Sequence, residues 1–249
     1  MSTATFRFYA ELNDFLPARS RQRDVDHAFA AGTSVKDAVE ALGPPHTEVD
    51  LILVNGTSVG FAHRLRDGDR VSVYPVFESF DVAGLSPLRE IPLRDLRFVA
   101  DVHLGKLARL LRLLGFDVTW SATASDRDIA ETSAAQHRVA LTRDRGLLKR
   151  RRIDRGLFVR QDDPLEQLID VVSRLDLGRR LAPFTRCMSC NGRLVTVEKD
   201  EVDAMLPPVT RARVEHFTRC ASCGRAYWRG AHHAALQRVV DDVRRRAGV

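Results

Sequence analysis

The chain has 249 residues, of which 44% are apolar and 29% charged, and its formal net charge is +6. That apolar content is normal for a globular protein of one large domain or two to three small ones. No apolar run reaches the ~18 residues that a transmembrane helix requires, and the first residues carry no signal-peptide pattern. We therefore expect a cytoplasmic protein with no membrane partner.

The charge is distributed unevenly along the chain. Residues 1–80 carry 8 Lys and Arg against 11 Asp and Glu, whereas residues 97–160 carry 14 against 7. An acidic first part joined to a basic middle part indicates separate domains, and the basic part suits a polyanionic partner. A solvated arginine-rich surface without a partner is the alternative.

The first 80 residues show the element order of a β-grasp domain. Residues 5–9 alternate between apolar and polar as a half-buried strand does, and Thr33 or Ser34 can cap a short helix that ends at Gly43. A strand at 51–54 turns at Asn55-Gly56, which is a strong hairpin signal, and a last strand follows at 70–75.

Two segments of this domain, Val54-Asn-Gly56 and Leu65-Arg-Asp-Gly-Asp-Arg-Val71, resemble the ubiquitin-like sulfur carriers of thiamin and molybdopterin synthesis. Those carriers end in a free diglycine that is activated as a thiocarboxylate. Here the chain continues through Phe77-Glu-Ser-Phe80 and has no diglycine. The departure argues against sulfur transfer and favours a binding or positioning module with a protein partner.

After a linker at residues 81–95, marked by Gly84, Pro87 and Pro92, strands and helices alternate. We predict strands at 96–100, 116–120, 138–142 and 156–159, and helices at 104–114, 128–136 and 165–175. Such alternation implies a parallel sheet with helices on both faces, so the fold class of residues 96–178 is α/β.

Acidic residues follow the predicted strands. Asp101 and Asp144 each come directly after an apolar strand, and Asp126 and Asp128 lie at the start of the helix between them. Ligands of open α/β sheets gather beyond the carboxyl ends of the strands, and a shared Mg²⁺ or Mn²⁺ would offset the repulsion between carboxylates. Such a site can activate a water molecule beside a phosphate.

Each carboxylate has a structural alternative. Asp126 or Asp128 can cap the helix, and Asp144 can be a turn residue. Asp162 and Asp163 are better explained as caps of the helix at 165–175 than as metal ligands. Asp101 is the hardest of these residues to explain without a ligand.

Basic residues flank the same carboxylates, and a basic rim of this kind holds a nucleic-acid backbone without reading its bases. The candidates for binding a nucleic-acid backbone are Lys106, Arg109 and Arg112, which we place largely off the apolar face of their helix, together with Arg143 and Lys149. The run 149–152, taken alone, is also consistent with a solvated turn.

The four cysteines form two Cys-x-x-Cys turns, Cys187 with Cys190 and Cys220 with Cys223. This spacing predicts a zinc ribbon at residues 179–235, with a structural Zn²⁺ because protein fills all four positions. Two disulfides or buried free thiols are the alternatives. The remaining residues near the ribbon are expected to play other parts: His216, His232 and His233 are not ligands, and Tyr227 and Trp228 pack the core rather than stack on bases. Residues 236–249 form a C-terminal helix and tail.

Five segments together resemble the Mut-seven C-terminal RNase family. They are 98–117 (Phe-Val-Ala-Asp101 through Gly115-Phe-Asp117), 126–128, 138–149, 186–192 and 220–232. The resemblance implies a PIN-like nuclease domain with an appended zinc ribbon, and bacterial members often carry a ubiquitin-like N-terminal domain.

The resemblance also implies a Mg²⁺- or Mn²⁺-dependent ribonuclease whose acidic residues match Asp101, Asp128 and Asp144, with Asp126 a weaker match. Two departures from the family pattern concern the site. His103 stands where an apolar residue, usually Met, is expected, and it either packs or lines the site. The run 125–128 is less acidic than in the family. A catalytically inactive RNA-binding adaptor is the alternative function, because basic surfaces and zinc ribbons bind nucleic acid without chemistry.

Overall fold

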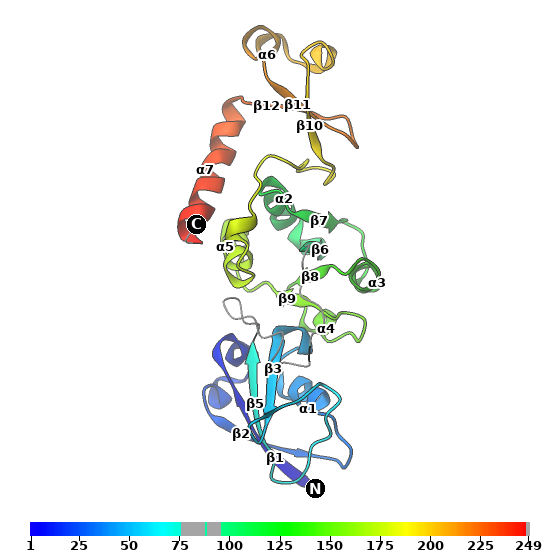
Figure 1. The fold of residues 1–249 in the computed structure, drawn as a ribbon, viewed down its shortest axis with the longest axis vertical. Coiled ribbons are helices and arrows are strands. Elements are labelled where there is room, and N and C mark those ends of the chain that lie inside the picture. The colour runs from blue at the N-terminus through cyan, green and yellow to red at the C-terminus, as the bar shows by residue number, and fades with distance from the viewer. Residues whose placement is uncertain (76–87, 89–95, 248–249) are drawn as a thin grey trace. The chain divides into compact units, whose positions relative to one another are not determined.

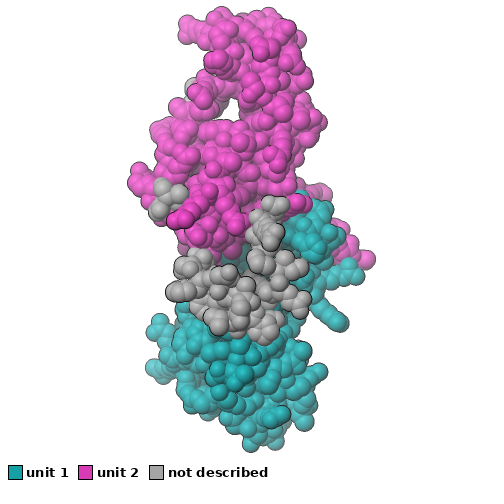
Figure 2. Space-filling model, viewed as in Figure 1, with its two compact units in different colours: residues 1–95, 133–158 teal, residues 96–132, 159–249 magenta. Residues whose placement is uncertain are grey.

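The computed structural model describes residues 1–75, 88 and 96–247 (Figure 1). The chain divides into two compact units, residues 1–95 with 133–158 and residues 96–132 with 159–249 (Figure 2). Apart from Leu88, the predicted linker at 81–95 lies outside the described residues, as does the segment 77–80. Within the described ranges, no helix is long and apolar enough to cross a membrane.

The first unit contains a five-stranded mixed sheet ordered β2-β1-β5-β3-β4. Its central strands β1 and β5 are parallel, and β2 and β3 pair with them antiparallel from outside. This is the predicted β-grasp domain. Its elements are β1 (Ser2–Phe8), η1 (Ala10–Phe15), η2 (Ala18–Ser20), β2 (Asp24–Phe29), α1 (Val35–Leu42), η3 (His46–Glu48), β3 (Val49–Val54), β4 (Thr57–Ser58) and β5 (Arg70–Pro75).

Local sequence signals set the ends of these elements. The Ser34 side chain caps α1 by accepting a hydrogen bond from the Asp37 amide at 3.1 Å. Gly43 ends the helix at a φ of 136°, in the left-handed half of the backbone map. Asn55 and Gly56 make the predicted hairpin turn, with φ angles of 51° and 83°.

The same unit also takes in β8 (Val139–Thr142), α4 (Arg145–Leu148) and β9 (Gly156–Phe158). Strands β8 and β9 are parallel. The one-turn helix α4 was not predicted, because four residues are too few to show a helical period. Phe158 packs against the apolar core of the β-grasp domain, so a segment of the middle domain joins the first unit.

The second unit begins with β6 (Arg97–Ala100) and β7 (Asp117–Trp120), which are parallel. Between them lie η4 (Val102–Leu104) and α2 (Gly105–Leu113), whose Leu107 and Leu111 are fully buried. Gly115 ends α2 at a φ of 96°, as predicted. Helix α3 (Asp126–Gln136) follows β7, and its last turn belongs to the first unit. Later in the chain come α5 (Pro164–Arg174) and then η5 (Gly178–Arg180).

The strands of the middle domain are ordered β7-β6-β8-β9 in one four-stranded sheet. Both strand pairs named above are parallel, and helices connect successive strands. The predicted fold class, α/β with a parallel sheet beside a β-grasp domain, is confirmed.

The C-terminal part of the second unit is a small antiparallel sheet, ordered β10-β11-β12. Its apolar core contains Val202, Leu206 and Phe217, and the partly buried Trp228 packs against this core, as expected. The elements are β10 (Leu194–Val197), η6 (Asp203–Met205), α6 (Pro208–Arg213), β11 (Phe217–Cys220), β12 (Ala226–Trp228) and α7 (Ala231–Arg246). Helix α7 begins five residues earlier than predicted.

Candidate metal centre and nucleic-acid interface

The four cysteine side chains converge next to the small C-terminal sheet, where Cys220 is the last residue of β11. One sulfur from each of Cys187, Cys190, Cys220 and Cys223 lies within 4.8 Å of the others. The Sγ atoms of Cys187 and Cys223 are 3.7 Å apart, and those of Cys190 and Cys220 are 3.4 Å apart. Four thiolates at ~2.3 Å from a tetrahedral zinc ion would lie ~3.8 Å apart. All four cysteines are free of disulfides, so the geometry fits a metal ion and not two disulfides.

Hydrogen bonds favour the thiolate form of Cys187. Burial alone would raise the pKa of this thiol, but donors around it lower the pKa to about 6. One donor is the Tyr227 hydroxyl, 3.0 Å from the sulfur, and others are the amides of Cys190 and Ser189. Burial and the adjacent sulfur raise the pKa of Tyr227, so its hydroxyl keeps the proton that it donates. Tyr227 therefore supports the metal site through its hydroxyl.

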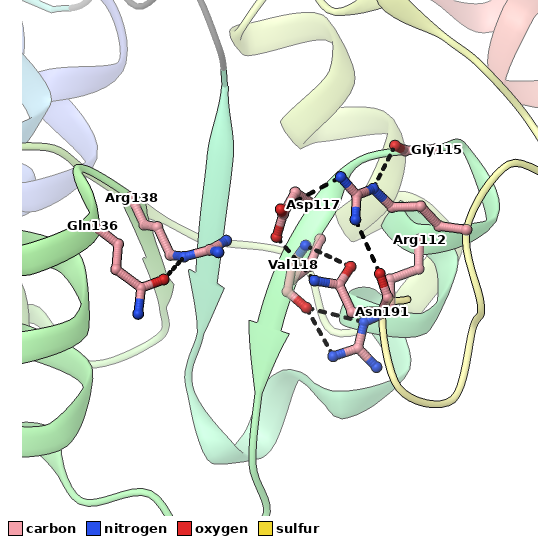
Figure 3. A network of polar contacts seen from close by, with 8 residues as sticks. Arg112, Gly115, Asp117, Val118, Gln136, Arg138 and Asn191 are labelled. Carbon is pink, nitrogen blue, oxygen red and sulfur yellow. Dashed lines mark hydrogen bonds and ion pairs between the residues drawn. The ribbon is translucent and has the colours of Figure 1, made fainter. Parts of the chain in front are cut away.

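The first cysteine turn is bound to the middle domain by a polar network (Figure 3). Asn191 accepts a hydrogen bond from the Val118 amide at 3.0 Å and donates to Asp117 at 2.8 Å. Arg186 pairs with the same Asp117 at 3.4 Å and donates to the Gly115 carbonyl at 3.2 Å. The cysteine turn thus has a fixed position on β7.

Arg112 is the centre of this network and is only 3% exposed. Its guanidinium donates to the Val118 carbonyl at 2.7 and 3.0 Å, and to the carbonyls of Ser189 and Met188 at 2.8 and 3.3 Å. Burial lowers the pKa of Arg112, and nearby sulfurs and Asp117 act in the opposite direction. The predicted position off the apolar face is wrong for Arg112, because backbone carbonyls from β7 and the cysteine turn surround its guanidinium.

Lys106 and Arg109 instead line a pocket of about 610 Å³ at the start of α2. The other lining residues are His103, Gly105, Trp120, Asp162, Pro164 and Gln167. Trp120 donates from its indole nitrogen to the Val102 carbonyl at 3.2 Å. A Cβ atom at position 105 would lie 2.6 Å from the Trp120 ring, so the ring requires glycine there. His103 is exposed and lines this pocket.

Asp101 is 6% exposed and follows β6 directly. Its Oδ1 accepts a hydrogen bond from the Val102 amide at 2.6 Å. Asp128 forms a capping box with Ser125, whose amide and hydroxyl donate to Asp128 Oδ2 at 2.8 and 2.7 Å. The Ser125 hydrogen bonds lower the pKa of Asp128 below its ordinary value. Asp126 occupies the first turn of the same helix, α3.

Asp144 lies in the first unit and caps α4, where its Oδ1 accepts from the Gly146 amide at 2.7 Å. Its second carboxylate oxygen has no hydrogen bond or ion pair to the described residues. Arg143 is exposed, and Lys149 donates from Nζ to the Glu40 carbonyl at 2.6 Å. Asp163 caps α5 with hydrogen bonds from the Leu165 and Glu166 amides, as predicted, and Asp162 lines the pocket.

In the part of the chain that the structure describes, the cysteines are the one group of three or more His, Cys, Asp and Glu side chains that converges on a point. The histidines at 216, 232 and 233 lie outside this group. His233 instead stacks on Phe184, with ring centroids 4.5 Å apart.

Comparison with known families gives two matches, which are consecutive along the chain. Residues 96–240 match the model of the Mut7-C RNAse domain. The chain belongs to the Mut7-C RNAse domain family. Residues 1–81 match the Mut7-C ubiquitin model. The Mut7-C match contains both the pocket and the four cysteines, and the resemblance noted in the sequence is confirmed.

Other comparisons add little to the Mut7-C assignment. A search of curated proteins found no match. Solved structures that are similar include the small archaeal modifier protein 1 of Haloferax volcanii, with 17% identity, 31% of this chain and 100% of that chain covered, and a TM-score of 0.26. A Pyrococcus furiosus protein assigned provisionally as molybdopterin converting factor subunit 1 has 21% identity, with 31% and 100% covered and a TM-score of 0.26.

Sequence reasoning missed Trp120 and Gln167 as pocket residues of the Mut7-C domain. Trp120 ends a strand, and its only sequence signal is the compensating glycine at 105. Gln167 lies on α5 and donates to the Gln161 carbonyl at 2.9 Å. Nothing in a helical pattern marks that amide as part of a pocket.

Proposed function

We propose that this protein is a ribonuclease that hydrolyses RNA phosphodiester bonds with the help of Mg²⁺ or Mn²⁺. The proposed ligands of that ion are Asp101, Asp128 and Asp144, with Asp126 beside them, on a PIN-like nuclease domain. The four cysteines hold Zn²⁺ in a structural role.

The observation that carries this proposal is the basic pocket at the start of α2. Lys106 and Arg109 are three residues apart, so they share one face of the helix. A pocket of about 610 Å³ is within the size range of small-ligand sites. With Trp120 in its lining, it offers the two features that single-stranded nucleic acid binds: cations for phosphate and an aromatic ring for a base.

The acidic residues suit the proposed ion because Mg²⁺ and Mn²⁺ prefer oxygen ligands. Asp101 accepts a hydrogen bond from the Val102 amide and Asp144 accepts one from the Gly146 amide, and these bonds fix the direction of each carboxylate. A divalent ion there would supply an activated water and neutralise charge on the phosphate. Lys106, Arg109 and Arg143 would hold the RNA backbone, with His103 at the pocket edge.

A second candidate function, an RNA-binding adaptor without catalysis, is favoured by a separate observation. Asp128 is already engaged in a capping box with Ser125. If that engagement persists, the basic pocket binds RNA but the carboxylates hold no ion.

We further propose the domain division 1–80, 81–95, 96–178, 179–235 and 236–249, with a protein partner for the first domain. Four free cysteines that hold metal favour a reducing compartment, and we place the protein in the cytoplasm.

Two experiments test these functions. In the first, the full chain is incubated with labelled single-stranded RNA and Mn²⁺, with and without EDTA. Fragments that appear only with Mn²⁺ support the ribonuclease. Binding without metal-dependent fragments supports the adaptor and refutes catalysis.

The second experiment tests the pocket by fluorescence. The chain has two tryptophans, so Trp228→Phe leaves Trp120 as the reporter. Titration with a short oligoribonucleotide in EDTA should quench the fluorescence of Trp120. Lys106→Gln removes one phosphate contact, so it should reduce the magnitude of the slope of log K against log[salt] by about 0.7. Unchanged Trp120 fluorescence at saturating RNA would remove the pocket from the proposal.

A further inference from the structure

The β-grasp domain buries a polar face under a segment of the RNase domain, within the first compact unit. Every residue from 44 to 50 is buried, including His46, Glu48 and Asp50, which are at most 7% exposed. Charged side chains are almost never buried to this extent unless they are paired. We call Glu40, His46 and Glu48 the docking face.

The partner of the docking face is the segment 145–158. His46 Nε2 lies 3.0 Å from the Ile153 carbonyl, while its Nδ1 lies 2.6 Å from the Glu40 carboxylate. The Glu48 carboxylate accepts a hydrogen bond from the Phe158 amide. The Phe158 ring also meets Phe15 edge to face, with centroids 5.5 Å apart. These hydrogen bonds and the ring contact show that the docking face and the segment 145–158 form a specific interface.

Two cationic side chains of the RNase domain, Lys149 and Arg145, also make contacts in this interface. Lys149 Nζ donates to the Glu40 carbonyl at 2.6 Å. The Arg145 guanidinium lies 5.0 Å from the Phe15 ring centroid and 5.3 Å from that of Phe158, and it donates to the Asp14 carbonyl at 3.4 Å. Arg145 therefore makes a cation–π contact with an aromatic ring from each side of the interface.

We propose that the β-grasp domain competes with RNA for Arg145 and Lys149, and so limits the affinity of the RNase domain for RNA. This inference rests on the proposed function. A phosphate that binds either cation competes with a carbonyl or an aromatic partner supplied by the N-terminal domain. The neighbouring Arg150, Arg151 and Arg152 are exposed, so opening the docking face joins two further cations to an existing basic run. The N-terminal domain is then an autoinhibitory domain that lowers the affinity of this basic surface for RNA, and we call this its guard role.

The test first loosens the docking face without substituting either cation. His46→Leu removes both hydrogen bonds of the ring, and Phe158→Leu, which removes one aromatic partner of Arg145, is the second variant should the first fail to fold. The matched control is His27→Leu on β2, a strand separated from β3 by β1 and β5. Hydrogen exchange at the amide of residue 158, relative to its intrinsic rate, reports docking in the full chain, and it should accelerate in the two test variants only.

The second step measures binding of a single-stranded oligoribonucleotide in EDTA as a function of salt. Two released cations should steepen the slope of log K against log[salt] by about 1.4, at about 0.7 per phosphate contact. At ~0.15 M salt a slope that is steeper by about 1.4 corresponds to roughly tenfold tighter binding of the oligoribonucleotide by the test variants than by wild type. Adding Arg145→Gln and Lys149→Gln to His46→Leu should restore the wild-type slope.

The outcomes separate this inference from the proposed function. Faster exchange at Phe158 with unchanged RNA affinity and slope would overturn the guard role. Unchanged exchange in both test variants would overturn the assignment of the docking face. Absence of RNA binding in every variant would overturn the proposed function and the guard role together, while the docking measured by exchange would stand.

Discussion

Arg112→Met offers a quantitative test of how the cysteine turn is held on the middle domain. Arg112 is 3% exposed and donates to the carbonyls of Val118, Met188 and Ser189. Methionine keeps most of the apolar stem but leaves three carbonyls without their donor. An unpaired buried acceptor costs about 1–3 kcal/mol. Since Ser189 is exposed and water can reach its carbonyl, we take the low end for each and expect a loss of about 3 kcal/mol.

Urea denaturation of the zinc-loaded chain measures this loss as a lower midpoint. Arg109→Met, one helical turn earlier on an exposed position, is the control and should change the stability by less than about 0.5 kcal/mol. Because Met188 and Ser189 lie between two metal-binding cysteines, Arg112→Met should also speed the release of zinc to a chelator. A loss below about 1 kcal/mol with unchanged zinc release would refute the structural role of Arg112.

Three further predictions follow from single residues. Burial would raise the pKa of Glu40, but the hydrogen bond and charge of His46 lower it below 4.5. The contribution of Glu40 to docking is thus complete above that pH and is lost as the pH falls through the lowered value. The protection factor of the Phe158 amide, which corrects for the slower intrinsic exchange in acid, should therefore fall on acidification in wild type and fall less in Glu40→Gln. Gly115→Ala should cost more than about 2 kcal/mol in unfolding free energy, because φ is 96° and the new Cβ would lie 2.2 Å from the Ala182 carbonyl; a loss under about 0.5 kcal/mol would contradict this reasoning. Cys190→Ser should lose bound zinc by metal analysis and expose β10–β12 to hydrogen exchange, whereas full zinc content would show that three thiolates suffice.

The features predicted correctly from the sequence depend on local patterns. Two Cys-x-x-Cys turns predict their own convergence, and Ser34 and Asp163 are recognisable as helix caps from the residues that follow them. The Asn55-Gly56 turn likewise carries its own conformational requirement.

The features that were missed depend on contacts between distant parts of the chain. The carbonyls that surround Arg112 include two from residues 76 and 77 positions later, so the helical pattern could not indicate them. Lys149 and the Glu40 carbonyl are 109 positions apart, and the sequence gives no sign that they meet. For Asp128 the sequence offered helix capping as an alternative to metal binding. The structure contains such a cap, because Asp128 forms a capping box with Ser125.

The central claim is that acidic residues of the middle domain support metal-dependent RNA cleavage, and Asp101→Asn tests it most directly. Asparagine retains the oxygen that accepts the Val102 amide hydrogen bond, so the variant removes charge and leaves the cap. The control is Asp200→Asn, an exposed residue near the cysteine sheet. We predict that with Mn²⁺ Asp101→Asn cleaves single-stranded RNA at least about 100-fold more slowly than wild type, a barrier increase of about 3 kcal/mol, with unchanged zinc content, while Asp200→Asn cleaves normally. Cleavage by Asp101→Asn at the wild-type rate would contradict the account.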